Sequence, residues 1–328
     1  MVKYTHILKY LSASAMFFAP FICSGQVEKQ LTPAEIKQQT IVTEPVTLKK
    51  GFIRSGMLTN YRVADKYFTD DGIKEYYPSN IWGTKSVYNL TFQYGISDRM
   101  EVELSTEYMN SRQESQKTEF IAATNTAKTV VTRQKGTGIG DTYVKIRYQI
   151  FPETSYRVSV TGNINLAIPT GEKNPTDIRS AEQYDLPVGS GTYALGGGLF
   201  ARTIFYPYSF TFGLNYTYSF TGRKKFEITD IREIEFQPGE VLNLSLGANL
   251  HLNEWIVFSN ELTYQHKDKG TVNGHYSALL PLTWSASYRP GLVFQVRRFR
   301  LGESVTIPVK GKNTAADPLY IVMAQYVF

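Results

Sequence analysis

Acidic and basic side chains recur at every second position in several stretches of this sequence. Glu101 and Glu103 alternate on one stretch, and Lys145 and Arg147 alternate on another. Because alternate residues of a β-strand project to the same face, opposite charges on neighbouring strands can pair. Inside a small barrel such rows either fill the interior as a structural ladder or line a passage and select what enters it, and both interpretations stay open. The candidate residues for these inward rows are Glu101, Glu103, Glu107, Lys145, Arg147, Arg157, Arg202 and Arg289.

The same alternation adds further charges to the inward rows. It adds Arg54, Arg62 and Arg297 on the positive side, and Asp141 and Glu261 on the negative side. Positive charge is therefore in excess, and low-dielectric walls concentrate the field of such an excess. This pattern predicts a passage that favours small anions, including aromatic carboxylates, over cations of equal size.

Nucleophilic catalysis has one candidate pair, His275 and Ser277 in "NGHYS". Two residues apart on a strand share a face, as a nucleophile and its base require. No acidic or amide residue stands out as the third, orienting group, so we assign no catalytic residue and expect a protein that is not an enzyme. A lipid-active hydrolase remains an alternative. No cluster of His, Cys or carboxylate residues suggests a metal site, and no cofactor is expected.

The segments that carry these residues alternate between apolar and polar positions. "YSFTFGLNYTYSF" (208–220) and "EVLNLSLGANLHL" (240–252) place aromatic or aliphatic residues at every second position and small or polar residues between them. Such alternation is typical of β-strands with one apolar face. No internal run approaches the roughly 20 apolar residues that a membrane-spanning helix needs.

The connections between these strands decide which fold the apolar faces build. Tight connections such as 97–99, 152–155 and 297–300 alternate with long polar ones such as 111–137 and 222–238. Short periplasmic turns and long outer loops distinguish outer-membrane barrels. We therefore predict an all-β protein, a transmembrane up-and-down antiparallel β-barrel of about 12 strands, in contact with outer-membrane lipid. A secreted β-sandwich is the alternative fold, and a structural or adhesive barrel that acts through its loops is an alternative function.

The N-terminus reads as an export signal followed by a separate segment. Lys3 and Lys9 precede a short apolar stretch and a small-residue cleavage site, which predicts a signal peptide at residues 1–25 and localisation in a bacterial outer membrane. Residues 26–50 contain a capping box in "TPAE" that predicts a short helix through about Gln39, and they form a periplasmic arm or plug or, alternatively, a disordered lead-in. Residues 51–328 form the barrel. The aromatic C-terminus, Phe328, is expected to help the barrel assembly machinery recognise the last strand.

Charge and cysteine content exclude other classes. The formal charge of +6 includes Lys3 and Lys9, so removing them leaves 6 − 2 = +4, and the charges form no basic block. We therefore expect no nucleic-acid partner. The one cysteine, Cys23, belongs to the predicted signal peptide, so a disulfide framework is not expected in the mature chain.

Four segments resemble a known family. These are "GTGIGDTYVKIRYQIF" (136–151), "LAIPTGEKNP" (166–175), "LPVGSGTYALGGGLFA" (186–201) and "PGLVFQVRRFRLGESVTIPVKGKN" (290–313). Together they resemble the outer-membrane β-barrel family named for the meta-pathway of phenol degradation. The resemblance implies a channel or transporter for small, often aromatic or hydrophobic molecules.

Overall fold

The structure is a computed structural model of the chain. It describes residues 47–77, 82–121, 126–152, 158–174, 176–180, 183–226, 230 and 232–328, and it describes no side chains for 115–121, 126–130, 176–180 and 183–184. All of these residues belong to one compact unit, Leu31–Phe328. The predicted signal peptide, the predicted helix near 32–39 and most of the predicted arm lie outside the described residues.

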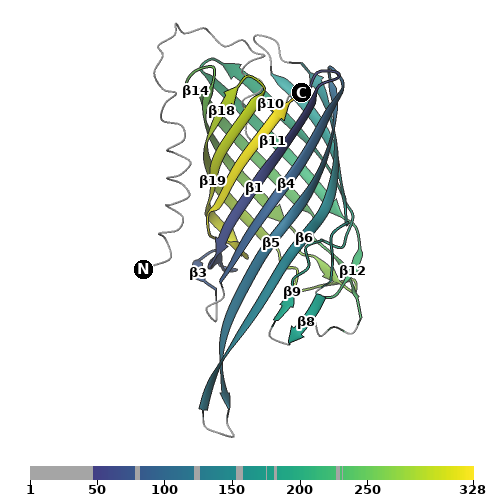
Figure 1. The fold of residues 1–328 in the computed structure, drawn as a ribbon, viewed down its shortest axis with the longest axis vertical. Coiled ribbons are helices and arrows are strands. Elements are labelled where there is room, and N and C mark those ends of the chain that lie inside the picture. The colour runs from purple at the N-terminus through teal and green to yellow at the C-terminus, as the bar shows by residue number, and fades with distance from the viewer. Residues whose placement is uncertain are drawn as a thin grey trace. The chain divides into compact units, whose positions relative to one another are not determined.

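The main sheet contains a closed barrel of twelve antiparallel strands (Figure 1). Each strand pairs with its neighbours along the chain, and the first and last strands pair from Arg54↔Val327 to Arg62↔Leu319. Closure leaves no unpaired edge, as a bilayer requires. The predicted all-β, up-and-down transmembrane barrel is therefore confirmed. The twelve strands are β1 (Ile53–Ala64), β4 (Trp82–Ser97), β5 (Met100–Ile121), β6 (Thr126–Phe151), β7 (Ser159–Ile168), β10 (Ala194–Phe205), β11 (Tyr208–Ser219), β14 (Val241–His251), β15 (Ile256–Lys267), β18 (Thr283–Val296), β19 (Phe299–Lys312) and β21 (Leu319–Val327).

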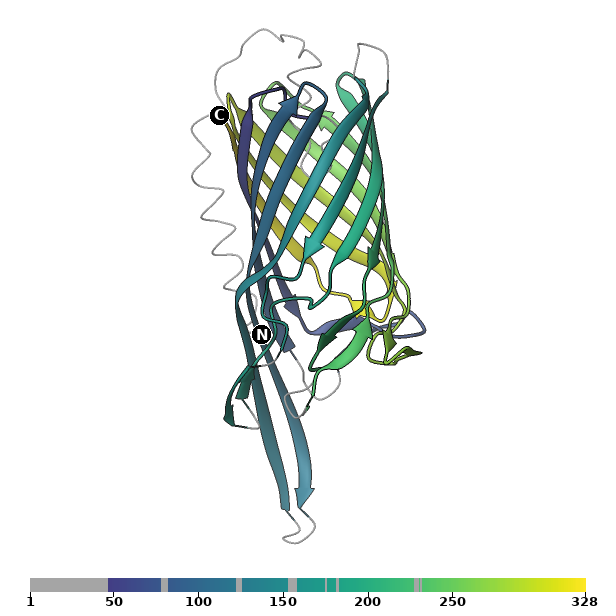
Figure 2. The same ribbon diagram turned by 90° about the vertical axis from the view of Figure 1, so that its right-hand side faces the viewer.

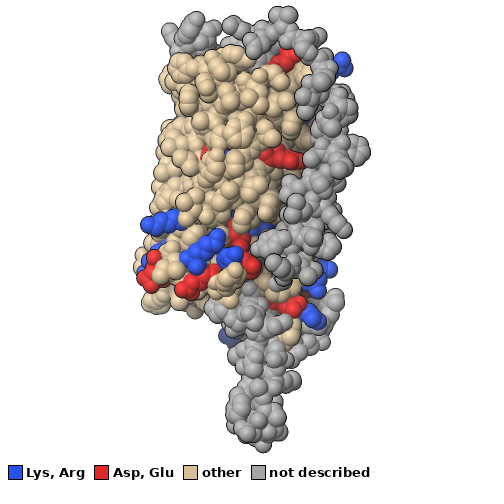
Figure 3. All heavy atoms as spheres, turned by 90° about the vertical axis from the view of Figure 1, so that its left-hand side faces the viewer, with Lys and Arg blue, Asp and Glu red and all other residues tan. Residues whose placement is uncertain are grey.

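Apolar residues face outward and small or polar residues face inward, as the alternation predicted. On β11 the side chains of Phe210 and Phe212 are exposed, whereas Ser209 and Thr211 are buried. Lipid stabilises the outward apolar row, and the barrel interior accepts the polar row. Seen from outside, one side of the barrel is a band of uncharged atoms, with most charged groups gathered toward the end that carries the long loops (Figure 3).

The two ends of the barrel differ in the length of their connections. At one end, here called the short-turn end, β18 and β19 are joined by Arg297 and Arg298 alone, and the C-terminus lies at the same end (Figure 1). The expected turn at 297–300 was too long, because Phe299 and Arg300 already pair with β18. The expected turn at 152–155 falls mostly on residues outside the description.

The opposite, long-loop end carries additional strands that the sequence did not predict. They are β2 (Lys66–Phe68), β3 (Lys74–Tyr76) and β20 (Thr314–Ala315); β8 (Thr176–Ser180) and β9 (Gln183–Asp185); and β12 (Gly222–Lys224), β13 (Ile234–Gln237), β16 (Thr271–Val272) and β17 (His275–Tyr276).

The segment 111–137, expected to be a polar loop, is instead a paired ribbon. β5 and β6 continue in register from Ser111↔Gly136 to Ile121↔Thr126 and project beyond the barrel (Figure 2). A two-stranded ribbon can be solvated on both faces, so its polarity did not reveal its pairing. Within the described residues, no helix is long and apolar enough to cross a membrane.

Candidate functional site

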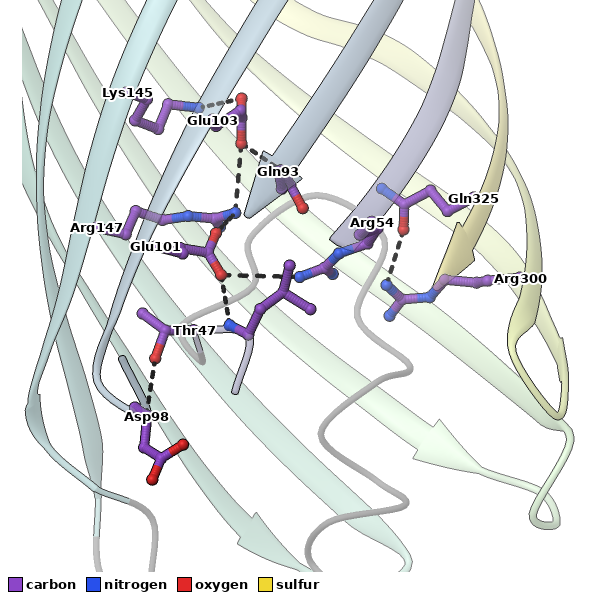
Figure 4. A network of polar contacts seen from close by, with 11 residues as sticks. Thr47, Arg54, Gln93, Asp98, Glu101, Glu103, Lys145, Arg147, Arg300 and Gln325 are labelled. Atoms are coloured by element: carbon purple, nitrogen blue, oxygen red, sulfur yellow. Dashed lines mark hydrogen bonds and ion pairs between the residues drawn. The ribbon is translucent and has the colours of Figure 1, made fainter. Parts of the chain in front are cut away.

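A network of ion pairs lies inside the barrel at the short-turn end (Figure 4). Its centre is Glu101, which follows the β4–β5 turn and is 0% exposed. Glu101 pairs with Arg147 on β6, and its Oε2 lies 3.9 Å from Nη2 of Arg54 on β1. A buried carboxylate needs such partners, because burial without them is costly.

Glu103 extends the network by one inward position. It accepts hydrogen bonds from Lys145 Nζ at 3.1 Å, from Arg147 Nη2 at 3.3 Å and from Gln93 Nε2 at 2.6 Å. The register places Glu103 opposite Lys145 and Glu101 opposite Arg147. The charges that alternate on the two strands therefore do meet.

Two further buried arginines face the same interior from other strands. Arg300 on β19 donates to Gln325 of β21 at 3.1 Å, and Arg202 on β10 is 1% exposed. Arg202 and Arg300 are close enough for their charges to repel each other, and the charge of Arg300 also acts on Arg54. The arginines thus form one electrostatic unit.

We call the seven charged residues of this network and of the two further arginines the short-turn cluster. Five of them are basic and two are acidic, so the described cluster carries a formal charge of 5 − 2 = +3. The members are Arg54, Glu101, Glu103, Lys145, Arg147, Arg202 and Arg300.

Uncharged polar groups border the short-turn cluster. Ser209 Oγ on β11 lies 3.0 Å from His251 Nε2 and 3.2 Å from Asn249 Nδ2, and both partners are on β14. Gln149 donates to Ser159 at 3.0 Å. This end of the interior is therefore polar around much of its circumference.

A short segment before β1 crosses the inner wall at the cluster. The backbone N–H of Leu48 donates to Glu101 Oε2 at 2.5 Å, and that of Lys50 donates to Asp98 Oδ1 at 3.2 Å. A Cβ at Gly95 would lie only 2.1 Å from the carbonyl oxygen of Lys49, so only glycine allows this approach. The segment 47–50 is thus bound at the short-turn end.

The remaining predicted inward residues lie apart from the cluster or outside the description. Arg289 on β18 pairs with Glu261 on β15 at 2.6 Å. Glu107 is further along β5 and near Tyr143. Arg157 lies outside the described residues, and Arg297 is exposed in the β18–β19 turn.

The long-loop end holds a second polar arrangement, built by the glycine-rich segments. Asp141 on β6 is buried and accepts hydrogen bonds from the backbone N–H groups of Gly171 at 3.2 Å and Ser190 at 2.8 Å. A Cβ on Gly189 would lie 2.4 Å from the Gly171 carbonyl oxygen, and one on Gly171 would lie 2.9 Å from Gly140. Three glycine backbones therefore meet beside one carboxylate, which fixes both ends of the connection 169–193.

The residues considered for catalysis form no catalytic arrangement in the described part of the chain. His275 is exposed on β17, and Ser277 Oγ accepts from the backbone N–H of Leu279 at 3.2 Å. No hydrogen bond joins His275 to Ser277 within the described residues.

Arg300 is the cluster residue that the sequence reading missed. It was placed in a turn, although the alternation of Gly302 and Ser304 on the inward row of β19 extends back to Arg300. The signal was therefore present, and the error lay in the boundary of the strand.

Comparison with known proteins agrees with this architecture. The family model described as "Putative MetA-pathway of phenol degradation" matches residues 94–298. The COG4313 outer membrane channel from Pseudomonas putida F1 is 12% identical, with a TM-score of 0.68 over 88% of this chain and 100% of that chain. This likeness shows the shared fold.

Two other solved structures are more distant. The NanC porin is 10% identical, with a TM-score of 0.45 over 83% of this chain and 98% of that chain. The CymD monoaromatic hydrocarbon channel is 10% identical, with a TM-score of 0.43 over 85% and 88% of the two chains. No curated protein has a significantly similar sequence.

Proposed function

Because the chain belongs to the family of the MetA-pathway of phenol degradation, we propose that it is an outer-membrane channel for small molecules, selective for anions. The observation that carries the proposal is the short-turn cluster, in which five basic residues accompany two acidic ones inside the barrel. Aromatic carboxylates are the solute class that combines this charge preference with the cargo implied by the family.

The selectivity follows from the net positive charge inside the barrel. The ion pairs of Glu101 and Glu103 offset part of the positive charge, and the field of the remainder is concentrated by the low-dielectric wall. Anions of a given size therefore enter more readily than cations. Arg202 and Arg300 add to this excess, because the ion pairs of the two glutamates are made with other basic residues of the cluster.

The channel is proposed to act without covalent catalysis. The short-turn end faces the periplasm, the long-loop end faces outward, and the predicted signal at 1–25 directs export. Residues 26–50 act as a periplasmic arm or plug whose last part, 47–50, is anchored by Glu101 and Asp98.

The test is the reversal potential of the purified protein in a planar bilayer across a salt gradient. We expect the sign of anion selectivity, with benzoate replacing chloride as a permeant ion. Replacing Arg202 and Arg300 together with Gln should move the reversal potential toward zero, whereas the exposed Arg298→Gln should leave it unchanged.

Three results would contradict the proposal. A cation-selective sign, or an unchanged reversal potential in the double variant, would reject anion selectivity. Absence of conductance even after removal of residues 26–50 would reject the channel itself. Gel mobility before and after heating confirms that each variant is a folded barrel.

A further inference from the structure

One carboxylate faces the lipid instead of the barrel interior. Glu303 on β19 pairs with Leu292 on β18 and with Val322 on β21, and both of these side chains are exposed on the outer wall. Its outward neighbours along β19 are Leu301 and Val305. Within the described residues Glu303 makes no hydrogen bond or ion pair.

The depth of Glu303 makes this position costly. It lies four residues from Phe299, the first residue of β19 at the short-turn end. With a rise of about 3.3 Å per residue and a tilt of about 40°, that places it roughly 10 Å inside a hydrocarbon band about 25 Å tall. Headgroups and water lie well away from it, so an intramembrane carboxylate indicates a specific partner.

A hydrogen-bond donor occupies the same outer wall. Asn260 on β15 also faces outward, opposite Ala248 and Pro290. Its Oδ1 accepts from the Tyr288 hydroxyl at 2.5 Å, and its Nδ2 makes no hydrogen bond within the described residues. Asn260 and Tyr288 border a depression of about 390 Å³ in the wall.

Asn260 and Glu303 lie at nearly the same depth in the membrane. In Figure 1 the strands that face the viewer rise to the right toward the end that carries the C-terminus. The path from β15 through β18 to β19 crosses two interstrand spacings of about 4.8 Å each. Because the strands are tilted by about 40°, this path moves about 6 Å along the membrane normal, away from the short-turn end. The step from Pro290 to Leu292 along β18 moves about 5 Å back toward the short-turn end, so the two displacements nearly cancel.

The same estimate separates Asn260 and Glu303 by roughly 12 Å around the wall, with Pro290 and Leu292 between them. An acceptor and a donor at equal depth on one face are self-complementary. A two-fold axis along the membrane normal, passing between them, brings each donor opposite the acceptor of the other copy.

We propose that two copies of this chain pack through the outer wall of β15, β18 and β19. In this dimer Glu303 accepts a hydrogen bond from the partner's Asn260, and Asn260 donates to the partner's Glu303. The contact satisfies both groups without water, and the low dielectric of the bilayer strengthens it. A second copy fits better than a lipid headgroup, because it supplies a donor at the depth of Glu303.

Cysteine cross-linking in native membranes tests this arrangement. In a Cys23→Ser background, Leu292→Cys places a thiol near the proposed axis, and a short bis-maleimide should convert it to a covalent dimer. Leu199→Cys, on the outward row of β10, is the matched control and should remain monomeric.

The side-chain contact is tested by removing either partner. Glu303→Leu and Asn260→Leu, each added to Leu292→Cys, remove both symmetric hydrogen bonds of the dimer. Each bond to a charged group is worth at least about tenfold, so the association constant should fall at least about a hundredfold and the cross-linked fraction should fall with it. Glu303→Gln keeps an acceptor and should retain most of the dimer. Glu303→Leu gives the outer wall an apolar residue, so normal heat-modifiability of this variant confirms that the barrel is intact.

Two outcomes would overturn the proposal. A monomeric mass in native mass spectrometry together with no cross-link at Leu292→Cys would exclude the dimer. Cross-linking that persists unchanged in both leucine variants would exclude the contact between Glu303 and Asn260.

Discussion

The backbone N–H of Ser190 donates a 2.8 Å hydrogen bond to the carboxylate of Asp141, which precedes it by 49 positions on the inner face of β6. Gly171 donates to the same carboxylate, so both ends of the connection 169–193 are fixed to one side chain. The connection in turn contacts another long loop, because Lys173 pairs with Glu233 at 3.0 Å. Asp141 therefore positions part of the structure that borders the long-loop end of the barrel.

Replacing Asp141 with Asn should loosen this connection. The amide has one acceptor oxygen and no charge, and each hydrogen bond to a charged group contributes about 1.5–3 kcal/mol. We expect the amide hydrogens of Gly171 and Ser190 to exchange at least about tenfold faster, because local opening becomes easier. Hydrogen–deuterium exchange followed by mass spectrometry measures this change.

The control for this experiment is Asp71→Asn, an exposed carboxylate at the same end of the barrel. It should leave exchange at Gly171 and Ser190 unchanged. If Asp141→Asn also leaves their exchange unchanged, the carboxylate does not hold the connection.

Replacing Glu101 with Gln should lower the free energy of unfolding of the barrel. Glu101 is fully buried between Arg147 and Arg54, and removing one member of a buried ion pair leaves uncompensated charge that costs about 3–5 kcal/mol. The urea midpoint of unfolding in lipid vesicles should fall accordingly.

An exposed ion pair provides the comparison for Glu101. Glu235→Gln removes the partner of Arg223, with which Glu235 pairs at 3.6 Å. Such a pair contributes at most about 1 kcal/mol, so the midpoint should move little. Equal effects of the two substitutions would show that the buried pair has no special role in stability.

The barrel could be predicted from the sequence because the alternation of apolar and polar residues recurs in strand after strand. The alternation in 208–220 indicated strands with one apolar face, and the contrast between short and long connections then indicated a closed barrel in a membrane. The pairing of Glu101 and Glu103 with Lys145 and Arg147 followed from the same periodicity, since these residues are on adjacent strands.

Contacts that depend on distant or irregular segments could not be predicted in this way. The approach of Gly189 to Gly171 joins two loops whose paths follow no period. For Glu303 two sequence rules disagree: the alternation of Gly302 and Ser304 places it outward, whereas charges usually face inward. The observed register with Leu292 decides for the outward position.

Acidification should release the contact between the β2–β3 hairpin and the end of β19. Asp70 accepts from Lys312 Nζ at 2.9 Å and from Asn313 Nδ2 at 3.0 Å, and these hydrogen bonds lower the pKa of Asp70 below its ordinary value of 3.8. The ionised carboxylate of Asp70 therefore stabilises the contact fully at pH values above its ordinary pKa. This stabilisation is lost as the pH falls through the lowered pKa and the carboxylate becomes protonated.

Spin labels report on this contact. Labels at Asp71→Cys and Lys310→Cys should show a distance distribution that broadens between about pH 5 and about pH 2. In an Asp70→Asn background the distribution should be broad at both values. A wild-type distribution that stays narrow at the acid limit would show that other contacts hold the hairpin.

Deleting Phe328 should reduce the fraction of protein inserted in the outer membrane. The Phe328 N–H donates to the Ile53 carbonyl oxygen at 2.8 Å, and its ring packs edge-on against Tyr326 with centroids 4.8 Å apart. The lost backbone bond contributes only about 1 kcal/mol, which is too little to unfold a closed barrel. A large loss of insertion would therefore come from recognition of the last strand during assembly, measured as the heat-modifiable fraction in purified outer membranes. Phe328→Tyr preserves the ring and should insert normally, whereas normal insertion of the deletion variant would remove the proposed role of the terminal aromatic residue.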